Sequence, residues 1–243
     1  MLMGLGVGLE IGIGNWELFV TREPTAVLLS AGLDSTVLVA AAAREGPVHP
    51  LYVSTGLAWE RAELAALDQL LATAPFEANV APVARLSFTV EDVYPATHWA
   101  LRGTPPGFDT ADEEVYLAGR NVVLLSKAAI YCAQHRIGRI ALGPLAGNPF
   151  PDARPEFFAA MARALSLGLD HPLEVVTPFL SFEKSEVIRL GVELGVPLEL
   201  TLSCMNPQQG RHCGQCSKCR ERRDAFREAG VRDLTIYASV PLR

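Results

Sequence analysis

Short apolar runs alternate along the chain with longer stretches in which apolar residues recur every three or four positions. Runs of this length, ended by glycine, proline or small polar residues, are typical of buried strands. One of them is interrupted by Pro82. The predicted strands are 26–30, 48–54, 80–88, 137–142 and 173–177.

The longer stretches predict helices. One of them, 121–134, is apolar on nearly all sides, which predicts a buried helix. Ser181 can cap another, at 182–194. Because strands and helices alternate, the predicted fold class is α/β, with a doubly wound, mostly parallel sheet whose ligands bind beyond the carboxyl ends of the strands. The predicted helices are 35–44, 59–73, 121–134, 155–167, 182–194 and 220–228.

The residues from Val27 to Thr36, VLLSAGLDST, carry the strongest local signal. A strand, a tight turn of small residues and a helix form the arrangement in which backbone N–H groups meet an anion. Hydroxyls add donors, and an acid beside phosphate needs a metal ion between the two charges. We therefore predict a pyrophosphate-binding loop that holds a nucleoside triphosphate with Mg²⁺; its residues are Ser30, Ala31, Gly32, Leu33, Asp34, Ser35 and Thr36. The alternative is an ordinary turn in which Ser30 or Asp34 caps the helix.

Four of the five cysteines lie close together, at Cys204, Cys213, Cys216 and Cys219. This spacing favours a structural zinc site with four thiolates. An iron–sulfur cluster and disulfides are the alternatives. Clustered thiols also favour a reducing compartment, so we expect a cytoplasmic protein, and we expect Cys132 to be inert packing.

Three other places carry candidate chemistry. Gly119, Arg120 and Asn121 stand before the helix at 121–134, where Arg120 can reach phosphate; the alternative is a helix capped by Asn121 with Arg120 in solvent. Lys184 begins a helix, a place where the dipole disfavours a cation unless an anion is bound nearby. Its alternative is pairing with Glu183 or Glu186.

The third place is a stiff, proline-rich segment after the strand at 137–142. Prolines hold Phe150, Asp152 and Arg154 in place, which suits selective hydrogen bonding to a small polar ring. The alternative is a rigid surface loop in which Asp152 pairs with Arg154. A long irregular stretch at 91–114 is typical of a lid or a binding loop.

Composition narrows the classes of protein. The chain has 243 residues and a formal net charge of −6, so nothing in it favours binding to duplex nucleic acid. Residues 1–25 are glycine-rich and apolar but carry acids and no basic start, so we expect an edge strand or hairpin there, with neither a signal peptide nor a membrane span. We expect a central domain at 26–200 and a zinc-binding segment with a helix at 201–243.

Taken in order, these motifs resemble those of the 7-cyano-7-deazaguanine synthases, a branch of the ATP pyrophosphatases. The resemblance covers about residues 26–230. Its most specific parts are PDARPEF and the cysteine spacing. The matching segments are SAGLDST at 30–36, GRN at 119–121, PDARPEF at 151–157, the segment 178–184 and TLSC at 201–204 with the three later cysteines.

The resemblance implies an ATP-dependent C–N ligase. Such an enzyme adenylates the carboxylate of 7-carboxy-7-deazaguanine; ammonia displaces AMP to give an amide, and a second ATP converts the amide to the nitrile. It implies ATP and Mg²⁺ at the loop, Zn²⁺ on the four cysteines, and often a homodimer. The residue roles implied are Asp34, Arg120 and Lys184 in catalysis and charge balance, and Phe150, Asp152 and Arg154 against the deazaguanine.

The chain departs from the family pattern at four points. Ala31 stands where the family loop has glycine, TGLAWER at 55–61 replaces a YGQRH-like stretch, Ala153 replaces a usual cysteine, and GPLAGN at 143–148 lacks the expected acid. The last three lie near the expected substrate, which leaves a second hypothesis open: a related adenylating enzyme that joins the acid to another acceptor, such as a protein amine. A third hypothesis is a non-catalytic, zinc-stabilised nucleotide binder.

Overall fold

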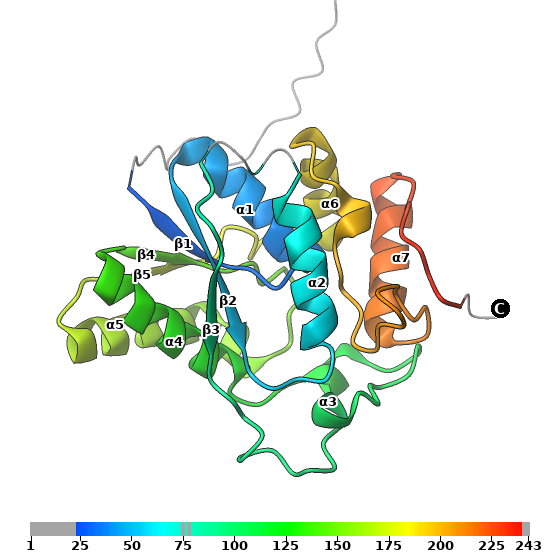
Figure 1. Cartoon of the computed structure of the whole chain (residues 1–243), viewed down its shortest axis with the longest axis horizontal. Coiled ribbons are helices and arrows are strands. Elements are labelled where there is room, and N and C mark those ends of the chain that lie inside the picture. The colour runs from blue at the N-terminus through cyan, green and yellow to red at the C-terminus, as the bar shows by residue number, and fades with distance from the viewer. Residues whose placement is uncertain (1–22, 74–75, 77–78, 240–243) are drawn as a thin grey trace, which may run out of the picture.

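Short apolar runs form a parallel five-stranded sheet in the computed structural model, which describes residues 23–73, 76 and 79–239 (Figure 1). The strand order is β3-β2-β1-β4-β5, and all neighbours run parallel. The order reverses on either side of β1, and in such sheets the crevice at the reversal is where ligands bind. The strands are β1 (Thr25–Leu28), β2 (Val48–Ser54), β3 (Ala84–Ser87), β4 (Arg139–Ala141) and β5 (Glu174–Val176).

Helices cover both faces of the sheet, as the predicted doubly wound α/β class requires. Ala26 and Val27 are adjacent on β1 and belong to different apolar cores, because successive strand residues face opposite sides. The core that contains Val27 is covered by α1 (Leu33–Glu45), α2 (Glu60–Leu71), α6 (Lys184–Glu193) and α7 (Ser217–Ala229). The core that contains Ala26 is covered by α4 (Arg120–His135) and α5 (Pro155–Leu169).

Most predicted elements are confirmed, and three local predictions are wrong. The predicted strand at 80–88 is strand only over Ala84–Ser87, with Val80 making an isolated bridge to Val48. Helix α4 is not buried all round, since Val122 and Ile130 are 41% and 49% exposed. Helix α6 is capped by Glu183 rather than Ser181.

The long connection after β3 is held against the C-terminal part of the chain. It contains the short helix α3 (Trp99–Arg102) and ends in the 3-10 turn η2 (Asp112–Val115). Arg220 of α7 donates to the carbonyl oxygens of Phe108 and Thr110 at 2.7 and 3.0 Å. Two further 3-10 turns are η3 (Pro151–Ala153) and η4 (Leu198–Leu200).

The C-terminal helix shares a core with the sheet domain. Ala225 and Phe226 of α7 are buried in the same cluster as Val27. The division at residue 200 stays a prediction, and the expected edge strand or hairpin falls almost wholly on residues 1–22, outside the described part. Within the described ranges, no helix combines the length and the apolar character that a membrane span needs.

Candidate functional site

The predicted phosphate loop joins β1 to α1. Gly32 is the N-cap of α1 and gives the helix no side-chain cap, so the first-turn N–H groups, which have no intrahelical partner, are available to an anion. Ser30 and Ser35 flank this opening, with their hydroxyl oxygens 3.5 Å apart. The loop therefore has the backbone and hydroxyl donors that an anion site needs.

In this turn the residue with left-handed backbone conformation is Ala31, although the neighbouring glycine, Gly32, would adopt it more easily. Ala31 has a φ of +59°, in the left-handed region, whereas Gly32 has an extended φ of −66°. The buried Ala31 carbonyl accepts a hydrogen bond from the Leu202 N–H at 2.8 Å. The C-terminal segment thus fixes the strained residue in place.

Two residues of the predicted loop face inward. Leu33 is 1% exposed and belongs to the apolar core. Thr36 is equally buried, and its hydroxyl donates to the Gly32 carbonyl at 2.7 Å. Leu33 can therefore offer an anion only its backbone N–H, while the Thr36 N–H is already bonded to the Gly32 carbonyl at 3.0 Å.

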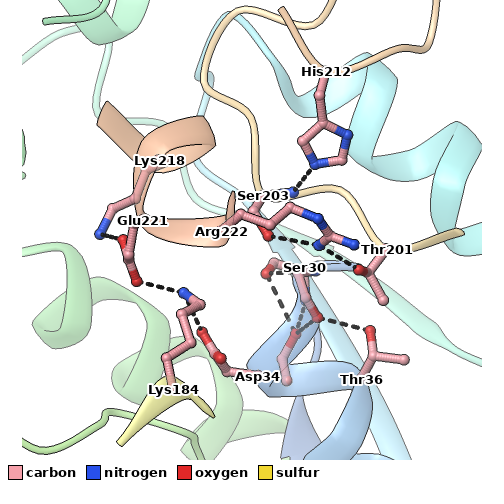
Figure 2. Close-up of polar contacts among 12 residues, drawn as sticks. Ser30, Asp34, Thr36, Lys184, Thr201, Ser203, His212, Lys218, Glu221 and Arg222 are labelled. Atoms are coloured by element: carbon pink, nitrogen blue, oxygen red, sulfur yellow. Dashed lines mark hydrogen bonds and ion pairs between the residues drawn. The ribbon is translucent and has the colours of Figure 1, made fainter. Parts of the chain in front are cut away.

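A chain of alternating charges begins at the loop (Figure 2). Lys184 Nζ lies 3.2 Å from Asp34 Oδ2 and also contacts Glu221, whose other oxygen lies 2.6 Å from Lys218 Nζ. Burial alone would lower the pKa of Lys184, but the two carboxylates raise it above its ordinary value. Burial would raise the pKa of Glu221, yet the two ammonium groups lower it to about 2.

These ion pairs show that the local alternative, in which Lys184 pairs with Glu183 or Glu186, is wrong. Glu183 and Glu186 form a capping box at the start of α6, while Lys184 reaches residues far away in the sequence. The other oxygen of Asp34, Oδ1, is buried without a hydrogen-bond partner among the described residues. An unpartnered carboxylate oxygen at a phosphate loop is chemically suited to a hard cation.

A fully buried arginine supports the loop from the C-terminal side (Figure 2). Arg222 donates to Thr201 Oγ1 at 2.8 Å and to the Leu198 carbonyl at 2.7 Å, and it approaches Ser203 Oγ at 3.4 Å. His212 accepts from the Ser203 N–H at 3.1 Å. These bonds hold the segment whose Leu202 N–H binds Ala31.

A cavity of about 280 Å³ opens beside the loop, beyond the carboxyl ends of β1, β2 and β4. Ser30 belongs both to the loop and to the cavity wall. Tyr116 and Phe150 stack in that wall with ring centroids 5.1 Å apart. An aromatic wall next to an anion site is typical of pockets that take a flat heterocycle.

Charged residues of the predicted site meet in this cavity. The Asn121 N–H donates to Asp152 Oδ2 at 3.1 Å, and Asn121 Nδ2 donates to the Asp152 carbonyl at 2.8 Å. Arg120 Nε is buried without a partner among the described residues. Gly119, with a φ of +77°, is the N-cap of α4, so the alternative with Asn121 as the cap is wrong. Arg154 lies apart, exposed at the start of α5.

The structure adds a carboxyl group that sequence reasoning missed. Glu63 of α2 is 7% exposed, lines the cavity and accepts a hydrogen bond from the Tyr52 hydroxyl at 3.0 Å. Its neighbour Glu60 is also buried and accepts from Thr55 N at 2.7 Å and Ser54 Oγ at 2.6 Å, which holds the turn after β2. The sequence signal was limited to two acids in the first turn of the helix after β2, which indicates a helix start and not a buried site.

The four clustered cysteines meet as predicted. Their sulfurs all lie within 4.8 Å of one another, and all four are buried and reduced. The N–H groups of Asn206 and Cys213 lie 3.3 and 3.2 Å from Cys204 Sγ, an arrangement that stabilises a thiolate. The cluster can hold a metal ion, and α7 begins within it.

Comparisons with known proteins identify the family of the chain. The family described as "Queuosine biosynthesis protein QueC" matches residues 25–230. A 7-cyano-7-deazaguanine synthase of Anaeromyxobacter dehalogenans is 36% identical, with 87% of this chain and 94% of the relative covered. Proteins of the same name from Anaeromyxobacter sp. strain Fw109-5 and Methanothrix thermoacetophila are 35% and 34% identical, covering 90% and 86% of this chain and 99% and 96% of their own. The chain therefore belongs to the QueC family of queuosine biosynthesis proteins.

Proposed function

We propose that the protein is an ATP-dependent ligase that converts 7-carboxy-7-deazaguanine and ammonia into 7-cyano-7-deazaguanine. The observation that carries the proposal is the place of Ser30, which joins an anion-binding loop to an aromatic-walled cavity. An acid activated at its carboxyl group must lie next to the phosphate that receives it, so one continuous site serves both partners. The family named above supports the same reaction.

The proposed role of each residue in the loop and the cavity follows from its charge. The donors around Gly32 suit the pyrophosphate, and the unpartnered Asp34 Oδ1 fits a Mg²⁺ ion that would neutralise charge on it as it departs. Positive charge comes from Lys184, which contacts Asp34, and from Arg120, which lines the cavity together with Ser30. The role proposed for Phe150 and Asp152, which line the cavity, is contact with the heterocycle.

Zinc fits the cysteine cluster. A tetrahedral site with Zn–S bonds of about 2.3 Å has S···S edges of about 3.8 Å. Three of the sulfur pairs are 3.6, 3.9 and 4.0 Å apart. These separations are too long for disulfides, and they suit a single ion better than a cluster of irons, which spreads its thiolates further. The role proposed for the ion is structural, in a protein that works where thiols stay reduced, the cytoplasm.

The test is a substrate-omission experiment. The purified protein is incubated with ATP, Mg²⁺, 7-carboxy-7-deazaguanine and ammonium, and the products are identified by mass. We expect AMP, pyrophosphate and the nitrile, with none of them formed when the acid is left out. Turnover of ATP that ignores both acid and ammonium contradicts the proposal.

A different acceptor is the second candidate, and a neighbouring cleft favours it. This cleft, of about 370 Å³, shares Phe150 and Asn148 with the first cavity and reaches Lys184 and Lys218. A second opening onto the reaction centre gives room for an amine larger than ammonia, such as a protein amine. With ATP and the acid present and ammonium absent, a mass increase on an added acceptor favours this candidate.

We also propose a homodimer. The exposed face of α5 offers Ala159, Ala160 and Ala164 together with Leu167, which is 75% exposed. Ile130 adds an exposed apolar side chain on the neighbouring α4. Light scattering after size exclusion should give twice the chain mass, and Leu167→Glu should shift it toward the monomer; an unsubstituted monomer contradicts this proposal.

A further inference from the structure

The cavity holds a carboxyl group to which the proposed roles above assign nothing. Glu63 is 7% exposed and lies in the cavity wall together with Ser30, Arg120 and Asp152. A buried acid on a cavity wall costs stability unless it is fully paired. Its side-chain partners are the Tyr52 hydroxyl, which donates to Oε2 at 3.0 Å, and the Trp59 side chain. This placement suits a group that acts on a ligand.

Its neighbour shows what a purely structural acid looks like in the same turn. Glu60 accepts four hydrogen bonds, from Ser54, Thr55 and Gly56, and these close the turn after β2. Asp152 is likewise engaged by the Asn121 N–H. Glu63 differs from Glu60 because it accepts fewer hydrogen bonds and lies on the cavity wall.

We propose that Glu63 is the general base that deprotonates the incoming ammonium in the amide-forming step. The inference rests on the proposed function, because it needs an acyl-adenylate in the cavity beside Ser30. The Glu63 carboxylate takes one proton from ammonium, and the freed nitrogen lone pair forms a bond to the acyl carbon. The acyl C–O bond breaks, its electron pair leaves with AMP, and the nitrogen loses its second surplus proton to water.

The surroundings give Glu63 a suitable pKa. Burial raises the pKa to about 7, against the lowering effects of the Arg120 charge and the Tyr52 hydrogen bond. An acid with a pKa near the working pH is the most effective proton acceptor. The titratable and charged groups around it are Tyr52 on β2, Glu60 on α2, Tyr116 after η2, Arg120 on α4 and Asp152 on η3.

The test compares two nucleophiles in the variant Glu63→Gln, which keeps a side-chain oxygen for Tyr52. With ammonium at pH 7 we expect amide formation to fall by about 10²-fold, the usual worth of a general base. With hydroxylamine, which is mostly unprotonated at neutral pH, we expect a rate within a few-fold of the unsubstituted protein. Acid-dependent exchange of pyrophosphate into ATP reports adenylation alone and should be unchanged.

The pH profile sharpens the test. At fixed total ammonium, the unsubstituted protein should reach a plateau above the pKa of Glu63, while Glu63→Gln should keep rising tenfold per pH unit as free ammonia accumulates. Tyr52→Phe removes a bond that stabilises the carboxylate, so the bend should move to higher pH. Equal losses with both nucleophiles, or an unchanged profile, overturn the inference. Absence of exchange in the unsubstituted protein overturns the proposed function itself, and the inference with it.

Discussion

The loop side and the cavity side of the site meet at Ser30, and their charged groups differ in how fully they are paired. On the loop side, Lys184 lies between Asp34 and Glu221, and the buried Arg222 donates to several oxygens. On the cavity side, Arg120 Nε has no partner among the described residues, and Glu63 is a buried acid whose side-chain bonds come from Tyr52 and Trp59. The first arrangement is complete before any ligand binds, and the second is not.

This difference indicates that the two sides have different functions. A satisfied network holds its members in one geometry, which suits a site that positions a polyphosphate. Groups short of partners are stabilised when a ligand supplies them, which suits a site that selects a substrate. Among the charged groups of the loop side, the exception is Asp34 Oδ1, the atom that we expect to reach the metal ion.

Asp34→Asn should produce the largest loss. The amide weakens a hard-cation ligand and removes the charge that holds Lys184, so we expect acid-dependent pyrophosphate exchange to fall by about 10³-fold. The control is Glu45→Gln at the other end of α1, which should retain normal exchange. Near-normal exchange by a folded Asn variant would place the metal elsewhere and remove the distinction between the two sides.

Cys219→Ser should destabilise the loop side as a whole. Cys219 is fully buried in the first turn of α7, the helix that carries Glu221 and Arg222. We expect loss of bound zinc by elemental analysis and about 3 kcal/mol or more from the free energy of unfolding. Cys132→Ser is the matched control, since Cys132 is equally buried but lies in α4, and it should retain the metal. Full metal content in Cys219→Ser would contradict a four-thiolate site.

The loop side was largely predictable from the sequence because its signals are local. The turn between β1 and α1, the cysteine spacing and the first position of Lys184 in a helix can all be seen within a few residues. Arg222 could not be predicted, because RERRD indicates a solvated helix. Its burial arises only when α7 packs over Leu198 and Thr201.

The cavity side was harder to predict because its walls come from distant segments. Two acids at the start of α2 are what a helix dipole favours in solvent, so they carried no sign of burial. Glu63 becomes a cavity residue only through Tyr52 on β2 and Arg120 on α4. Tyr116, which follows η2, likewise stacks on Phe150 from a distant part of the sequence.

Glu221→Gln tests whether the charge chain stabilises the fold. The carboxyl pKa is lowered from 4.5 to about 2, so its contribution is present above pH 4.5 and is lost as the pH falls toward 2. We expect the variant to be less stable by about 1–3 kcal/mol at pH 7, with the difference closing below pH 3. Urea unfolding at several pH values measures it, with Glu228→Gln, exposed on the same helix, as the control. A difference that is constant with pH would mean that Glu221 acts through packing alone.

Ala31→Gly should have the smallest effect and the opposite sign. Ala31 has a φ of +59°, which costs an L-residue about 1–2 kcal/mol, while glycine adopts it freely. Greater freedom of the unfolded chain and the lost methyl group offset part of this gain, so we expect a net stabilisation of about 0.5 kcal/mol by urea unfolding. Ala40→Gly is the matched control: it is buried in the helical part of α1 and should lose about 1 kcal/mol or more. An equal loss of stability in both variants would contradict backbone strain at Ala31. Opposite signs would mean that Ala31 is strained in the folded loop and is held in that conformation by its hydrogen bond with Leu202.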